Sequence, residues 1–338
     1  MPSLKSLFAR HEMVLVLVIV FEVILFQMLG NNFLVSRNLS NVFRHSVEIG
    51  LLALAMTPVI LTGGIDLSVG SMMGLCAVLF GMMVNSLGLD PWLAALAAIA
   101  FGALGGGLNA VLITRLNLPP LIVTLGTFSL FRGLAEALTK GAESFSGFPA
   151  SFLALGNANV AGLPAQIWVF FVVAIGIWLL VHHTTFGRSF RAIGYAPEGA
   201  KYAGIPVARN TSLAYILAAV ILVARLGEAR ANAGIGYELL AITAVVLGGV
   251  SIFGGSGTVG GTLLGWIALA FLNNGLTRIS DYRLFDQPVA SVARELSGLL
   301  TGVLLLAALS IGAVTKSLAL SRARKQSLAK PNSNPATS

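Results

Sequence analysis

The stretch LTGGIDLSVGSMMGL at residues 61–75 separates two apolar runs, 46–61 and 67–87. An α-helix needs roughly 17–25 apolar residues to cross about 30 Å of hydrocarbon, and both runs approach or reach that length. The glycine pair between them interrupts the helical pattern, and Asp66 places a carboxylate beside segments that otherwise belong in lipid. The region therefore predicts two membrane helices joined by an irregular polar segment.

Further apolar runs continue the pattern on both sides. Together the candidates are 12–29, 46–61, 67–87, 92–114, 121–139, 164–182, 210–226, 238–253, 258–276 and 294–313. They predict an all-α, polytopic membrane protein with about ten transmembrane helices. Runs 46–61 and 238–253 are short and adjoin glycines, so we expect them to be broken or tilted. Run 12–29 is long for a signal peptide and lacks a clear cleavage site, so we interpret it as a retained helix.

The composition agrees with a membrane location. Of the 338 residues, 56% are apolar and only 10% are charged, whereas soluble domains carry about a quarter charged residues. The 38 glycines suit close packing between membrane helices. The single cysteine, Cys76, excludes a disulfide within the chain.

The formal net charge of +8 is explained better by membrane topology than by nucleic-acid binding. Basic residues are densest, with little acidic compensation, in 182–209 and after residue 315. The positive-inside rule places both segments in the cytoplasm. We therefore predict a multi-pass protein with cytoplasmic termini: an N-terminus, 1–11, a transmembrane domain, 12–313, and a disordered tail, 314–338.

Asp66 is the first candidate functional residue. Carboxylates within a membrane usually face a cavity or a partner, and irregular backbone there must be buried or line water. One interpretation places Asp66 near a translocation pathway; the other, which we favour locally, has Asp66 or Ser68 capping a helix that begins at residue 67. The two are compatible. The predicted pathway positions are Thr62, Gly63, Gly64, Asp66, Ser68, Gly248 and Gly249.

A second glycine-rich segment, LGGVSIFGGSGTVGGTLLG at 247–265, has the same order of apolar run, Gly-Gly break and apolar run. The topology puts both breaks on one side of the membrane. This similarity indicates either two parallel repeats or a chance match. The segment lacks the lysine of a phosphate-binding loop, so we expect a tight turn with close helix packing and no ATP binding by this chain.

The loop 183–209 is the only long segment between helices that we expect on the cytoplasmic side. Within it, Pro197–Ala203 predicts a short helix with proline near its first position, and Gly204 would end that helix. A surface helix flanked by arginines suits docking of a partner; the alternative is a solvated loop with arginines near lipid. The candidate docking residues are Gly187, Arg188, Arg191, Gly194, Pro197, Glu198, Ala200 and Gly204.

Other kinds of site find little support in the sequence. His182 and His183 are adjacent and lack a third ligand, so no metal site is predicted, and metalloprotease and hydrolase motifs are missing. Glu22 and Glu136 lie inside apolar runs, where we expect each to face a neighbouring helix. These acids, with Asp66, keep an ion- or proton-coupled secondary transporter as the alternative function. Nothing indicates an enzyme.

Four motifs carry a family resemblance. They are TGGIDLSVGS at 62–71, NLPPLIVTLGT at 117–127, FGRSFRAIGYAPEGAKYAGIPV at 186–207 and GYELLAITAVVLGGVSIFGGSGTVGGTLLG at 236–265. Together they resemble the permease subunits of bacterial carbohydrate ABC importers of the ribose, xylose and rhamnose type. The resemblance covers 12–313 and implies an inner-membrane permease for a monosaccharide or related small sugar. It also implies that the chain has no ATPase and binds no cofactor.

The resemblance further implies partners. Cytosolic ATP-binding subunits would consume the ATP and dock on 186–206, whose short helix would be the coupling helix. A second permease chain, identical or related, would complete the pathway, and a periplasmic binding protein would deliver the sugar.

Three segments bear on the branch of the family. ELSGLLTGVLLLAAL at 295–309 and the long outside loop 140–163 look most like the rhamnose and autoinducer branches, which we favour over ribose. The aromatic residues of that loop should lie on the membrane surface or pack over the mouth of the protein. Run 210–226 departs from the family pattern, because it looks too short for a comfortable span.

Overall fold

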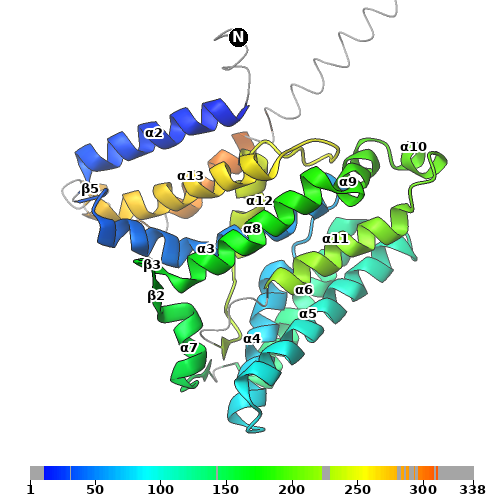
Figure 1. Cartoon of the computed structure of the whole chain (residues 1–338), viewed down its shortest axis with the longest axis horizontal. Helices are drawn as coiled ribbons and strands as arrows, with labels where there is room; N and C mark the ends of the chain where they lie inside the picture. The colour runs from blue at the N-terminus through cyan, green and yellow to red at the C-terminus, as the bar shows by residue number, and fades with distance from the viewer. Residues whose placement is uncertain are drawn as a thin grey trace, which may run out of the picture.

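A computed structural model shows an almost entirely helical chain (Figure 1), as predicted. It describes residues 11–30, 32–141, 144–222, 229–279, 283–284, 287–288, 293, 296–307 and 310. The helices are α2 (His11–Leu29), α3 (Ser36–Leu61), α4 (Val69–Asn85), α5 (Pro91–Thr114), α6 (Pro120–Leu138), α7 (Ala150–Asn157), α8 (Ala165–His183), α9 (Thr185–Tyr195), α10 (Pro197–Tyr202), α11 (Val207–Leu222), α12 (Tyr237–Leu247), α13 (Val259–Arg278) and Leu296–Ala307.

The strands are two residues long and form antiparallel pairs. They are β1 (Ser144–Phe145) with β4 (Ala229–Arg230), β2 (Asn159–Val160) with β3 (Leu163–Pro164), and β5 (Arg283–Leu284) with β6 (Gln287–Pro288). The predicted tail 314–338 and residues 1–10 of the predicted N-terminus lie outside the described residues.

Each predicted apolar run coincides with one helix. Within the described ranges, α2, α3, α5, α6, α8 and α13 are long and apolar enough to cross a membrane, while α4, α12 and Leu296–Ala307 are apolar but shorter. The chain is therefore a multi-pass helical membrane protein. The count of ten spans and the two parallel repeats stay predictions.

Three predicted boundaries were wrong. Run 46–61 is not short, because α3 begins at Ser36 and includes polar residues that an apolar count rejects. Run 238–253 is helical only to Leu247, where Gly248 and Gly249 end α12. The helix expected from residue 67 begins at Val69. For run 210–226, α11 begins earlier, at Val207, and residues 223–226 lie outside the described part of the chain.

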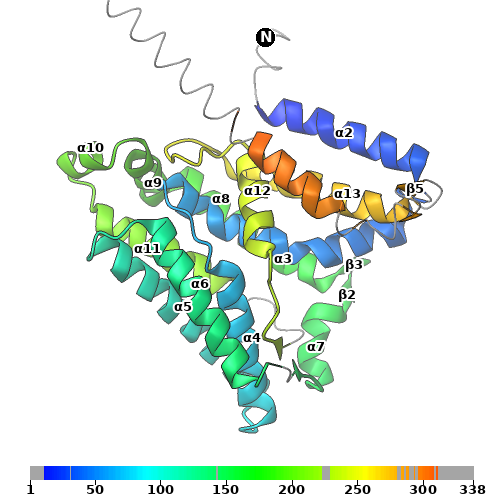
Figure 2. The same cartoon turned by 180° about the vertical axis from the view of Figure 1, so that it is seen from behind.

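Helix α3 lies at the centre of the molecule. Residues 50–62 are buried without interruption, and α8, α11, α12 and α13 pack around them (Figure 2). Outward-facing surfaces of the peripheral helices are apolar; large exposed side chains include Phe21, Leu96, Leu104, Ile122 and Val172. Water-soluble monomers rarely expose so much contiguous apolar surface, so these faces contact lipid or another apolar partner.

Small residues bring α5 and α11 together. The buried face of α5 consists of alanines and glycines with one asparagine and one isoleucine, and Gly106 lies against the main chain of Tyr215 and Ile216. Such a stripe lets membrane helices approach closely. The short α11 is thus anchored along its length by α5.

The loop 140–163 packs over one end of α4. Phe148 and Phe152 are buried, and each ring centroid lies 5.0 Å from that of Phe80. Trp92, at the start of α5, meets Phe152 edge-on. Of the two expectations for the aromatic residues of this loop, the structure supports packing on the body of the protein.

Candidate functional site

Helices α9 and α10 form a projecting corner beside the end of α8 and the start of α11 (Figure 1). This corner, residues 185–204, is called the docking corner below. Thr184 caps α9 by accepting a hydrogen bond from the amide of Gly187. Pro197 occupies the first turn of α10, which ends at Tyr202, and Gly204 follows at φ +78°. The predicted short helix is therefore present, with the predicted start and stop residues.

One side of this corner is open to solvent. Arg188, Pro197, Glu198 and Gly204 are exposed, as a docking surface requires. Two further residues here, Tyr195 and Tyr202, were not predicted from the sequence and are 87% and 88% exposed. Exposed aromatic side chains among charged ones are typical of interface anchors. We call Arg188, Tyr195, Pro197, Glu198 and Tyr202 the docking face.

The other predicted docking residues hold the corner to the body. Gly187 lies tightly against the main chain of Val181, and Ala200 is buried. Arg191 donates to the carbonyl of Val181 at 3.0 Å and lies 3.2 Å from Nδ1 of His182. Partial burial lowers the pKa of the Arg191 guanidinium, which still carries its charge at neutral pH because its usual pKa is so high. These contacts fix the angle of α9 against α8.

The inner side of α9 meets both glycine breaks. Gly194 lies against the carbonyl of Leu61, at the end of α3, and against Gly254 and Gly255 in the turn between α12 and α13. The amide of Gly255 donates to that Leu61 carbonyl at 3.0 Å, and Gly254 abuts Gly63. A side chain at Gly194 would overlap this backbone. We call Gly63, Gly194, Gly254 and Gly255 the glycine junction.

A side-chain contact adds a second link between the docking corner and α13. His182, which touches Arg191 through Nδ1, accepts a hydrogen bond at Nε2 from the amide of Val259, the first residue of α13. That bond requires the tautomer with its hydrogen on Nδ1, so Arg191 packs against Nδ1 without a hydrogen bond to it. A displacement of α9 would therefore reach the ends of α3 and α13 directly.

Asp66 lies in a closed polar cluster next to the first break. Its Oδ1 accepts hydrogen bonds from the amide and hydroxyl of Ser68, at 2.8 and 2.6 Å. Asn109 donates to the Ser68 hydroxyl at 2.9 Å, and Thr127 donates to Asn109 at 2.7 Å. Ser68 is the N-cap of α4 without a side-chain cap bond, so Asp66 stabilises the turn before the helix.

The cluster ties α4, α5 and α6 together and leaves no space for a water molecule around Asp66 and Ser68. Thr62 bonds its own helix through the carbonyl of Val59, and Gly64 lies against the hydroxyl of Tyr215. The pathway role of the seven residues around the two breaks stays a prediction.

The two other membrane acids differ. Glu22 is buried on α2, on the side that packs against α13, as predicted. Glu136 is exposed, so the expectation that it faces a neighbouring helix was wrong; the buried stripe of α6 runs through Phe131 and Ala135, and Glu136 lies beside it.

Among the described residues, no three His, Cys, Asp or Glu side chains are grouped for a metal ion.

Comparisons with known proteins give consistent matches. The sequence family described as the branched-chain amino acid transport system / permease component matches residues 38–309. The chain is similar to the autoinducer 2 import system permease protein LsrD of Escherichia coli (strain K12), Escherichia coli O9:H4 (strain HS) and Shigella flexneri. Each is 37% identical over 337 residues, which cover 96% of this chain and 97% of the relative. No solved structure matches the chain.

Proposed function

The chain belongs to the family of permease components of branched-chain amino acid transport systems, and on this premise we propose that its docking face receives a cytosolic ATP-binding subunit. It is a transport permease and not an enzyme. Such a permease needs a surface that converts motion of the ATPase into motion of membrane helices. The observation that carries the proposal is the glycine junction, because it joins the exposed α9–α10 corner to the end of α3 and to the turn between α12 and α13 through main-chain contacts.

The proposal includes an orientation. The docking corner would face the cytoplasm with both chain termini, since the basic residues of 182–209 and of the tail favour that side. A second permease chain would complete the pathway, and a binding protein would deliver the solute to the opposite face.

For the solute, we propose autoinducer 2 or a closely related small sugar-like molecule. Support comes from relatives named as autoinducer 2 import permeases, whose similarity extends over almost the whole of both chains. The family description names branched-chain amino acids, so an amino acid is the competing solute.

Docking can be tested by co-purification of the ATP-binding subunit. The double substitution Tyr195→Ala and Tyr202→Ala removes two exposed aromatic side chains, and interface anchors of this kind contribute about 2 kcal/mol or more. We expect the recovered ATPase to fall at least tenfold while the permease stays folded. Leu87→Ala is the matched control, because Leu87 is 71% exposed and lies in the turn after α4, away from α9 and α10 (Figure 1). Equal recovery with both variants would refute the docking assignment.

The solute can be tested by uptake in cells that carry the complete transporter. Removal of autoinducer 2 from the medium should require this chain and should stop when ATP is depleted. Dissipating the proton gradient while ATP is maintained should leave uptake intact. Uptake of L-leucine without uptake of autoinducer 2, D-ribose or L-rhamnose would overturn the proposed solute.

A further inference from the structure

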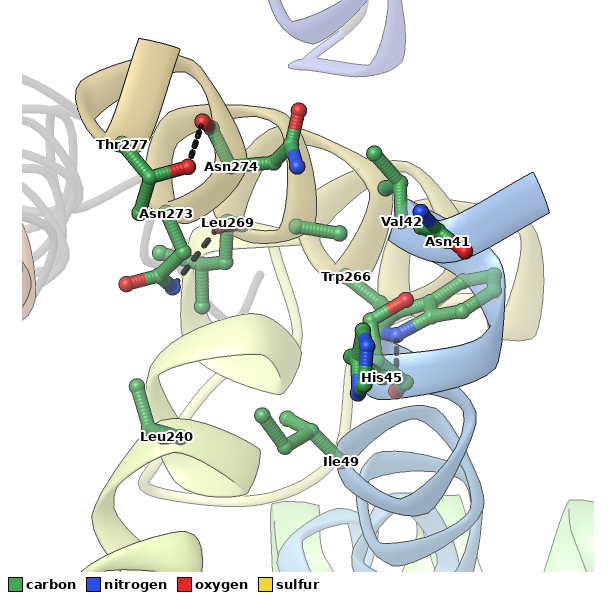
Figure 3. Close-up of a pocket in the computed structure, with 12 residues that line it drawn as sticks. Asn41, Val42, His45, Ile49, Leu240, Trp266, Leu269, Asn273, Asn274 and Thr277 are labelled. Carbon is green, nitrogen blue, oxygen red and sulfur yellow. Dashed lines mark hydrogen bonds between the residues drawn. The ribbon is translucent and has the colours of Figure 1, made fainter. Parts of the chain in front are cut away.

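A cavity of about 340 Å³ opens between α3, α12 and α13 (Figure 3). Small-molecule sites span roughly 300–1,000 Å³, so this cavity suits a small solute. It lies away from the glycine junction, towards the start of α3 and the end of α13. Its lining includes Asn41, His45, Ser46, Leu240, Trp266 and Asn273.

The polar groups of this cavity are incompletely bonded. The hydroxyl oxygen of Ser46 is buried and has no hydrogen-bond partner among the described residues. This oxygen does not face the cavity directly, but it loses no hydrogen bond when the Ser46 side chain turns towards a ligand. In the same part of the chain, no bond is found for the side chains of Asn41 and His45, and Asn273 uses only its amide nitrogen, on the Leu269 carbonyl.

The apolar part of the wall is rigid. Trp266 donates its indole N–H to the carbonyl of Ser46 at 2.8 Å and packs against Phe170 and Phe43. Leu240 and Ile49 line the lower part of the space in this view, below Asn273 and His45 (Figure 3). The aliphatic and aromatic side chains can pack against the C–H groups of a ligand, while the amide, imidazole and hydroxyl groups can donate and accept hydrogen bonds. A hydroxylated carbon ring or chain carries both C–H groups and hydroxyl groups, so it matches both parts of the wall.

Among the described residues that line the cavity there is no Asp, Glu, Lys or Arg. A zwitterionic amino acid would lose the hydration of two charges on entry and gain no ionic partner, which is strongly unfavourable. A neutral polyhydroxylated molecule meets no such cost.

The walls of the cavity are connected to the docking corner. Helix α3 carries Asn41 and Ser46 in its first half and ends at Leu61 in contact with Gly194. Helix α13 begins at Val259, bonded to His182, and carries Asn273 near its other end. Because a helix moves largely as a rigid body, tilting either one at the junction would change the width of the cavity.

We propose that this cavity binds the neutral, polyhydroxylated solute during import, with Asn41, His45, Ser46 and Asn273 holding its hydroxyl groups. The inference rests on the proposed function and deepens it, because it locates the solute and assigns selection against amino acids to this chain.

Cysteine protection tests the site in the complete transporter. The chain has one cysteine, Cys76, and it is fully buried. In a Cys76→Ser background, Asn41→Cys or Asn273→Cys introduces a thiol at the cavity wall. Autoinducer 2 or D-ribose should slow its labelling by a small methanethiosulfonate reagent at least fivefold, whereas L-leucine should not. Ser86→Cys, exposed after α4, is the control whose labelling no solute should change.

Kinetics provide a readout that misfolding would not imitate. His45→Leu should raise the KM for autoinducer 2 about tenfold and leave the maximal rate within twofold; Asn85→Leu, exposed at the end of α4, should change neither.

Unaltered KM and absence of protection in a transporter that imports autoinducer 2 would overturn the cavity assignment alone. Protection by L-leucine would overturn the neutral class. A wild-type transporter that imports none of the sugar-like probes would overturn the proposed function and this inference with it.

Discussion

The glycine breaks after α3 and after α12 use the same turn but are stabilised by different contacts. Each helix ends at a leucine, Leu61 or Leu247, and two residues later a glycine adopts the left-handed conformation, Gly63 at φ +82° and Gly249 at φ +85°. Besides its main-chain contacts at the glycine junction, the first break is held beyond this point by the hydrogen bonds around Asp66. The second is held by main-chain packing without side chains between the helices.

This difference shows how one sequence pattern can serve two purposes. Glycine allows both chain reversals, because its φ value is not restricted by a Cβ. At the second break glycine also allows α12 and α13 to touch, since Gly248 lies against Gly261 and Gly265 lies against the carbonyl of Ala244. The second break should therefore be sensitive to added volume, and the first to loss of polar groups.

The largest effect is expected from adding one methyl group at the second break. In Gly261→Ala the new Cβ would overlap the carbonyl oxygen of Gly248, so α13 must move away from α12. Overpacking of this kind costs about 3 kcal/mol, and we expect little folded protein by size-exclusion chromatography and a lower thermal midpoint in detergent. Gly260→Ala is the matched control, because its Cβ would have no atom closer than 4.0 Å. Similar losses in both variants would contradict the packing argument.

A smaller effect is expected at the first break. Asp66→Ala leaves the amide and hydroxyl of Ser68 without their acceptor in a buried cluster, at a cost of about 2 kcal/mol. Asp90 is an exposed N-cap that accepts from the amides of Trp92 and Leu93, so Asp90→Ala should cost about 1 kcal/mol. Thermal unfolding of the two variants in the same detergent gives the order. A more stable Asp66→Ala than Asp90→Ala would show that the buried cluster contributes less to folding than an exposed N-cap does.

Local structure was predictable from the sequence where one residue type dictates the backbone. Pro197 and Gly204 marked both ends of α10, and the glycine pairs marked both breaks. The apolar runs located ten of the described helices but missed α7 and α9. They also missed the true start of α3, because Asn38 bonds Asn274 inside the molecule and a hydropathy count treats it as a loop residue.

The glycine junction and the cavity could not be predicted, because they depend on contacts between distant residues. Gly63, Gly194 and Gly254 meet only after three separate segments have folded. Ser46 and Trp266 are likewise 220 positions apart, and neither carries a motif. The exposure of two tyrosines was also hidden. Helix α9 buries Phe190 and Ile193 and leaves Tyr195 outside, and α10 buries Ala200 and leaves Tyr202 outside.

The smallest effect separates two glycines near the end of the docking corner, Gly199 and Gly204. Gly204 has φ +78° and open space around it, whereas Gly199 lies within α10 and is not in the left-handed region. Gly204→Ala should therefore strain the end of α10 by about 1 kcal/mol and lower solute-stimulated ATP hydrolysis roughly twofold by changing the angle of the docking face. Gly199→Ala should be neutral or slightly stabilising, because alanine favours helix more than glycine does. ATPase assays on the reconstituted transporter compare them directly, and a stronger defect in Gly199→Ala would show that α10 docks through its glycine face and not through the tyrosine and charged side chains around it.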